Sequence, residues 1–201
     1  MTKARPEVVA QVTAAALIAQ QVGSNAMRDG LFLSLFSVQR LPYFMAGAAG
    51  LAIFAAQFSG YLLARRGPLR IAPGLFASSA TLFVVEWLLL RWQPSASAVL
   101  LYLHSSVLGP IAISSLWSLL NERFDPHSAK PLMARVAGAA TFGGLIGGLS
   151  AERVAALLPQ GTLLPLLGLT GGICVAGAVA LGKGAPSSRP RVAQEPDRAG
   201  A

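Results

Sequence analysis

Three polar side chains, Gln21, Asn25 and Arg28, lie four and three residues apart within the first apolar stretch of the chain. This spacing places them on one face of a helix. Because polar groups inside a bilayer point towards protein or water, the face predicts the lining of a substrate path, in which the forked guanidinium of Arg28 binds an anionic group. In the alternative interpretation these residues lie beside Asp29 at the membrane surface, where the helix simply ends.

Two ionisable side chains occur further along the chain. A carboxylate such as Glu86 would cost about 2.5–3.5 kcal/mol at the bilayer centre and less near its surface. Because Trp87, Arg91 and Trp92 follow it, we interpret Glu86 as an interfacial residue and keep it among the candidate cavity residues as the alternative. A proton relay is one interpretation of His104, but it has no acidic neighbour in the sequence, which favours a hydrogen-bonded packing histidine.

A polar stripe also follows a weak point in a later stretch. Ser114, Ser118 and Asn121 share one helical face and come soon after Gly109 and Pro110, which weaken the backbone hydrogen-bond ladder. A kinked helix with a polar stripe is typical of a cavity wall. Serine hydroxyls that bond within their own helix or to a neighbouring one are the alternative.

Closely spaced glycines predict helix packing. Small residues four apart allow two helices to approach closely in a membrane, and the chain contains two overlapping pairs of this kind, at Gly143, Gly144, Gly147 and Gly148. The spacing recurs at Gly168 and Gly172. No strand is predicted before these glycines and no Lys-Ser or Lys-Thr follows them, which excludes a phosphate-binding P-loop.

The sequence contains no pattern typical of an enzyme. It offers no Ser-His-Asp set in an apolar frame, no paired carboxylates and no cluster of metal ligands. The single cysteine, Cys174, excludes an intrachain disulfide. We therefore expect no catalysis, no cofactor and no bound metal.

Long apolar helices must carry these residues. Hydrophobic residues make up 54% of the chain and charged residues only 12%, whereas soluble domains contain about 25% charged residues. A helix needs about 20 mostly apolar residues to cross the hydrocarbon. Six stretches qualify, and they predict an all-α polytopic membrane bundle: residues 8–27, with a continuation to Phe36 left open, 41–63, 71–90, 98–120, 136–158 and 162–181.

Basic residues predict the orientation of this bundle. The net charge of +8 does not indicate a nucleic-acid partner, because the basic residues flank the apolar stretches. The two tails and the second and fourth connections hold Lys3, Arg5, Arg65, Arg66, Arg70, Arg123, Lys130, Arg135, Lys183, Arg189, Arg191 and Arg198. The other side holds only Arg28, Arg40, Arg91 and Arg153. The positive-inside rule therefore places both termini in the cytoplasm, and we expect a bacterial inner membrane.

The chain divides into a six-helix domain, residues 1–182, and a tail, residues 183–201, which is rich in Pro, Ser, Ala and Arg and is expected to be disordered. Asp125 and Pro126 are typical of a helix start and predict a short cytoplasmic helix before the fifth span. The first stretch has no small-residue cleavage site and is interpreted as a retained helix.

Two resemblances to known transporters follow from specific segments. Residues 60–70 resemble the motif between helices two and three of major facilitator transporters, with Ala64 where that family has an aspartate. Residues 28–33, then Leu41, Pro42 and Tyr43, and then residues 117–148 resemble nucleotide transporters of the ATP:ADP antiporter type. The matching positions in the last segment are Trp117, Leu119, Asn121, Phe124, Ala129, Lys130 and Leu132, and Pro131 stands where a basic residue is expected.

This second resemblance implies a major facilitator fold that holds its substrate between two six-helix halves, of which this chain supplies the first. The resulting hypothesis is a half-length membrane transporter of nucleotides or another anionic solute, completed by a homodimer or a separate second half. The transporting members are expected to use intramembrane lysines, whereas Lys3, Lys130 and Lys183 all lie outside the predicted spans. A non-transporting scaffold or truncated remnant is therefore the alternative, and a proton- or cation-coupled carrier based on Glu86 and His104 is a third hypothesis.

Overall fold

The computed structural model describes residues 5–124, 126–159 and 161–183, and this part of the chain contains helices but no strand. The prediction of an all-helical fold is therefore confirmed. The long helices are connected by short segments, one of which holds the 3₁₀ turn η1 (Val38–Arg40). They are α1 (Pro6–Leu35), α2 (Leu41–Arg66), α3 (Pro68–Leu90), α4 (Pro94–Arg123), α5 (Pro126–Leu157) and α6 (Leu163–Gly182).

Five of the described helices, α2 to α6, are long and apolar enough to cross a membrane. The chain is therefore an integral membrane protein. Helix α1, which contains several polar residues, is not one of these five, although its 30 residues are sufficient to span a bilayer. It packs against α4, α5 and α6, so protein groups surround much of its surface.

Two helix boundaries refine the sequence predictions. Helix α1 continues through Arg28 and Asp29 to Leu35, so the interpretation in which the helix ends at Arg28 is wrong. A single helix begins at Pro126 and runs on to Leu157, so the predicted short cytoplasmic helix is the first part of α5. The predicted cap at Asp125 and the predicted tail beyond Lys183 lie outside the described residues.

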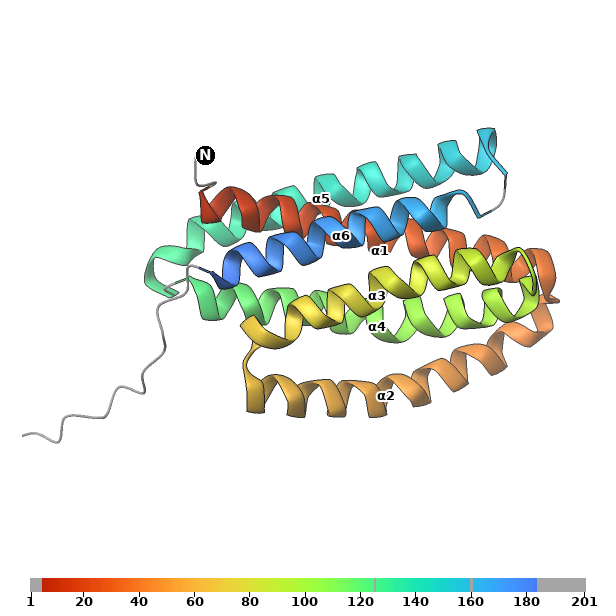
Figure 1. Ribbon diagram of the computed structural model, residues 1–201, viewed down its shortest axis with the longest axis horizontal. Coiled ribbons are helices and arrows are strands. Elements are labelled where there is room, and N and C mark those ends of the chain that lie inside the picture. Colours follow the sequence, from red (N-terminus) through yellow and green to blue (C-terminus); the bar gives the residue numbers. More distant parts are fainter. Residues whose placement is uncertain (1–4, 125, 160, 184–201) are drawn as a thin grey trace, which may run out of the picture.

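The helices pack in a repeated pattern (Figure 1). A row of contacts runs from α2 to α4, α1 and α5, while α3 packs on α4, α6 packs on α1, and α3 and α6 contact each other. Exchanging α1 with α4, α2 with α5 and α3 with α6 leaves this set of contacts unchanged. Short connections at alternating ends make each exchanged pair antiparallel, so the order of these contacts is the one that an inverted repeat would have.

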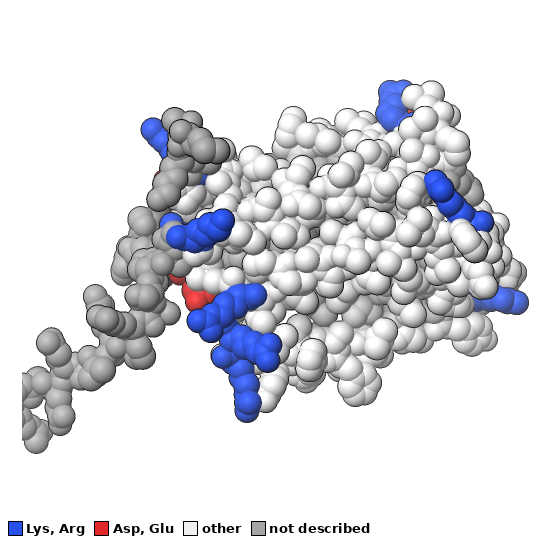
Figure 2. Space-filling view, viewed as in Figure 1, with Lys and Arg blue, Asp and Glu red and all other residues white. Residues whose placement is uncertain are grey.

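On the face shown in Figure 2, basic side chains gather at the two ends of the bundle, and the surface between them has none. The start of α1, the turns from α2 to α3 and from α4 to α5, and the end of α6 lie at the same end (Figure 1). Charge at both ends with an apolar surface between them is the distribution that a bilayer requires.

Close helix contacts depend on glycines in α5. A Cβ atom added at Gly143 or Gly147 would overlap the backbone carbonyl oxygens of Ala15 and Ala19 in α1. Helices α1 and α5 therefore approach through small residues four apart on both sides, which is a common packing mode in membranes. Gly144 and Gly148 lie on the edge of this contact, beside Val22.

The turn from α2 to α3 is joined to the end of α4. Gly67 has φ of 80°, a conformation that favours glycine. The backbone N–H of Leu69, in the first turn of α3, donates to Oε2 of Glu122 at 3.2 Å. A carboxylate at this position satisfies a free amide and interacts favourably with the helix dipole.

Candidate functional site

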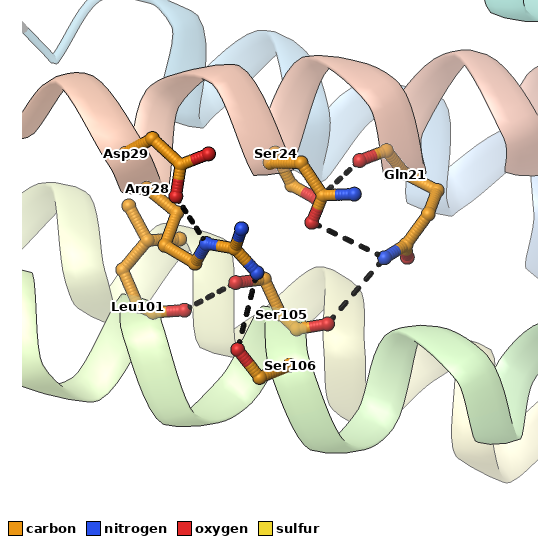
Figure 3. Close-up of polar contacts among 8 residues, drawn as sticks. Gln21, Ser24, Arg28, Asp29, Leu101, Ser105 and Ser106 are labelled. Carbon is orange, nitrogen blue, oxygen red and sulfur yellow. Dashed lines mark hydrogen bonds and ion pairs between the residues drawn. The ribbon is translucent and has the colours of Figure 1, made fainter. Parts of the chain in front are cut away.

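The polar stripe of α1 faces α4. Gln21 Nε2 lies 3.4 Å from the Asn25 side-chain oxygen and 3.4 Å from the backbone oxygen of Ser105 (Figure 3). Gly109 of α4 lies so close that a Cβ atom there would overlap the Gln21 amide. The absence of a side chain at Gly109 therefore allows Gln21 to occupy the contact between the two helices.

Arg28 also reaches α4. Its Nη1 donates to Ser106 Oγ at 3.1 Å and its Nε to Asp29 Oδ1 at 2.7 Å, and its guanidinium carbon lies 5.2 Å from the centre of the Tyr102 ring. A guanidinium has five N–H donors, and only these two take part in hydrogen bonds among the described residues. The other N–H groups are free to bind an anion.

The depth of Arg28 follows from the residue it contacts. Ser106 lies twelve residues after Pro94, which corresponds to ~18 Å along a helix, whereas the 30 residues of α4 span ~45 Å. The guanidinium therefore reaches towards the middle of the bundle. This geometry favours the interpretation of the stripe as an intramembrane polar face.

A hollow of about 320 Å³ lies beside this guanidinium, between α1, α2 and α4. The residues that line it include both charged and aromatic side chains: Arg28, Asp29, Phe32, Leu33, Leu41, Met45 and Tyr102. The side chain of Arg28 is 20% exposed and that of Asp29 is 55% exposed. Arg28 is the one cationic side chain in this lining, and Asp29, with which it forms an ion pair, is the one anionic side chain.

Pro110 adds a backbone acceptor on the same side of α4. Proline has no N–H, so the carbonyl of Ser106 lacks its usual donor four residues later. Ser106 thus offers both a hydroxyl and a carbonyl at this depth. Unpaired backbone groups inside a membrane are typical of positions that contact protein or a water-filled cavity.

The other predicted cavity residues of α4 do not contact Arg28. Ser114 and Asn121 are exposed, and Ser118 is half-buried with its hydroxyl donating to the backbone oxygen of Ser114 at 2.9 Å. They lie 8 to 15 residues after Ser106, towards the other end of α4. The structure thus brings Gln21, Asn25 and Arg28 together and leaves these three residues further along the bundle.

Glu86 forms a second polar cluster, which neighbouring helices enclose four residues before the end of α3, and its interfacial depth stays a prediction. The residue is fully buried, and His104 Nδ1 lies 2.8 Å from Glu86 Oε1. His104 Nε2 lies 2.9 Å from Ser79 Oγ, and the hydroxyl of Ser97 donates to the backbone oxygen of Glu86 at 2.8 Å. The acidic partner that His104 lacks in the sequence is therefore provided by α3.

The pairing of α3 with α4 contains a signal that could have revealed this cluster. The two helices form a hairpin around Arg91 and Trp92, and residues at equal distances from its turn lie opposite each other. Ser79 with His104, and Glu86 with Ser97, satisfy this relation. Because helical side chains lean towards the helix N-terminus, Glu86 then reaches deeper into the bundle and meets His104.

Comparison with protein-family models, with curated proteins and with solved structures finds no match for this chain. The functional interpretation therefore depends on the residues themselves. Within the described ranges no three side chains of His, Cys, Asp or Glu form a group suited to a metal ion. The two clusters on either side of α4 are the candidate sites.

Proposed function

We propose that this protein is a membrane transporter for an anionic solute, in which Arg28 binds the negative charge. One observation carries the proposal: an arginine with N–H groups that have no partner among the described residues borders a hollow between three helices. Intramembrane arginines that face a cavity are typical of substrate pathways. The inverted arrangement of the helices supports transport further, because many carriers are built from such repeats.

The solute class rests on the resemblance to nucleotide transporters. A phosphate group accepts the bidentate hydrogen bonds that a guanidinium donates, and a nearby Tyr102 ring adds an aromatic surface to the hollow. We therefore propose ATP or ADP as the first candidate substrates. The substrate path requires a second six-helix unit, and a second copy of this chain is the simplest source of one. The proposed orientation places both termini in the cytoplasm, and the proposed location is a bacterial inner membrane.

Uptake of labelled ATP and ADP into proteoliposomes tests this function. The full chain should accumulate label above empty vesicles, and Arg28→Gln should abolish the accumulation. Arg40→Gln is the matched control, because Arg40 lies at the same end of the bundle and stacks on Phe36 outside the hollow. Uptake equal to that of empty vesicles, also after mixing with a candidate second half, would contradict transport and favour a membrane scaffold.

A further inference from the structure

The cluster of Glu86, His104 and Ser79 takes no part in the anion site, yet it places a carboxylate and an imidazole inside the bundle. Side-chain exposure is 0% for Glu86 and 2% for His104. One carboxylate oxygen, Oε2, has no hydrogen-bond partner among the described residues. A buried carboxylate is costly unless its charge is compensated. A cluster of this kind is therefore sensitive to the gain or loss of one proton.

We propose that this cluster is a proton-binding site that controls anion binding at Arg28, and that the protein moves the anion together with a proton. The inference rests on the proposed transport function. Its physical basis is the sequence of contacts along α4. His104 bonds to α3, the backbone oxygen of Ser105 accepts from Gln21 of α1, and Ser106 accepts from Arg28. Three successive residues thus connect the two clusters.

The proton has a defined place in the cluster. In the empty state, neutral His104 donates from Nδ1 to the Glu86 carboxylate and accepts at Nε2 from the hydroxyl of Ser79. An arriving proton forms a bond to Nε2, and the Ser79 hydroxyl rotates to become the acceptor. The charge of the cluster changes from −1 to 0 and both observed heavy-atom contacts are kept. Departure of the proton reverses each of these changes.

The coupling to Arg28 is electrostatic. His104 and Ser106 are two residues apart, so their side chains point to nearly opposite sides of α4, about one helix diameter or ~10 Å apart. At this distance within a protein, opposite charges still attract each other. The empty cluster, with charge −1, competes with the anion for Arg28, and the proton removes this competition. By reciprocity, a bound anion strengthens proton binding to the same extent.

The other titratable groups of the surrounding helices contact different partners. Arg28 and Asp29 of α1 lie on the other side of α4, and Cys174 of α6 contacts the backbone oxygen of Thr13. Arg91, at the end of α3, stacks on Trp87. Gln20 of α1 is uncharged and donates to the backbone oxygen of Leu167. From α4 itself, Tyr102 faces Arg28.

Nitrogen-15 NMR of histidine in the full chain tests the proposal in phosphatidylcholine nanodiscs. The sequence contains two histidines, so a His127→Gln background leaves His104 as the only signal. We expect His104 to pass in one step from one protonated ring nitrogen to two as the pH is lowered. Arg28→Gln removes the opposing positive charge and should raise the proton affinity about fivefold or more. The matched control, Arg40→Gln, should leave it unchanged.

Two further variants distinguish the loss of the proton site from misfolding of the protein. Glu86→Gln should weaken proton binding at His104, because the imidazolium loses its counter-charge. Ser79→Ala changes only the contact at Nε2 and should shift the step without abolishing it. A folded protein whose His104 shows no step, or whose step Arg28→Gln does not move, overturns the proposal.

The outcomes separate this inference from the proposed function. Where ATP and ADP uptake is absent but Arg28→Gln still shifts the His104 step, the transport proposal fails and the proton site stands. Where uptake occurs and responds equally to a proton gradient in the wild type and in Glu86→Gln, the coupling is wrong and transport stands.

Discussion

The two sides of α4 carry polar clusters of opposite character. On the α1 side, Arg28 has N–H groups without a partner among the described residues, is partly exposed and borders a hollow, where we propose that a solute binds. On the α3 side, Glu86 and His104 are buried between helices, and the His104 ring packs against the Phe83 ring at a tilted angle. A partly open cluster is suited to a molecule that enters and leaves, whereas a sealed one admits nothing larger than a proton. Burial therefore separates the two roles within one turn of one helix.

The largest effect should follow from removing one partner of the sealed cluster. His104→Leu leaves the buried Glu86 carboxyl without its partner and should cost about 3–5 kcal/mol of unfolding free energy. Denaturant unfolding in micelles, followed by circular dichroism, measures this loss. The double variant Glu86→Leu/His104→Leu should recover most of it, since no buried charge remains. If the single and double variants lose the same unfolding free energy, the unpaired buried carboxyl is not the cause of the loss, and the contrast between a sealed and a partly open cluster is refuted.

A smaller effect is expected from crowding the α1 contact. Gly109→Ala displaces the Gln21 amide from Ser105 and should cost about 1–2 kcal/mol in the same unfolding experiment. Gly74→Ala is the matched control, because a Cβ atom there meets nothing within 4 Å. That control should be neutral or up to about 1 kcal/mol more stable, as alanine favours helix. A loss of unfolding free energy in Gly74→Ala that exceeds the loss in Gly109→Ala would contradict the packing described above.

Arg28→Gln should have a small effect on stability and a large effect on anion uptake. The ion pair with Asp29 is partly exposed, so its loss should lower the unfolding free energy by about 1 kcal/mol or less. Uptake of an anionic solute should be lost at the same time. Parallel measurements of unfolding and of proteoliposome uptake decide this point. Destabilisation as large as that of His104→Leu would place Arg28 with the structural residues.

The smallest effect is expected where the polar side chain is exposed and makes no contact with another helix. Ser114→Ala should change the unfolding free energy by less than about 0.5 kcal/mol. The same unfolding experiment measures it. If uptake also stays at the wild-type level, the anion path does not extend along α4 to this residue.

The length and apolar character of the hydrophobic stretches made the all-helical fold predictable from the sequence. The spacing of polar residues within the first stretch made the polar face of α1 predictable. The sealed cluster was not predicted, because the position of Glu86 before Trp87 and Arg91 favoured an interfacial residue. Depth along one helix does not indicate which neighbouring helix covers a side chain. The partner of His104 depended on the α3–α4 hairpin, and sequence proximity was a poor guide to it.

The contacts of α1 also have a consequence for how the protein is made. Among the described helices, α1 leaves the ribosome before the others and is not one of the five that are long and apolar enough to span a membrane, yet it packs on α4, α5 and α6, which are synthesised after it. Its glutamines, Asn25 and Arg28 therefore enter the membrane before their partners exist. The packing of α1 is complete only when the glycine face of α5 has been made. A chain that stops after α4 should therefore leave α1 less stably inserted in the bilayer.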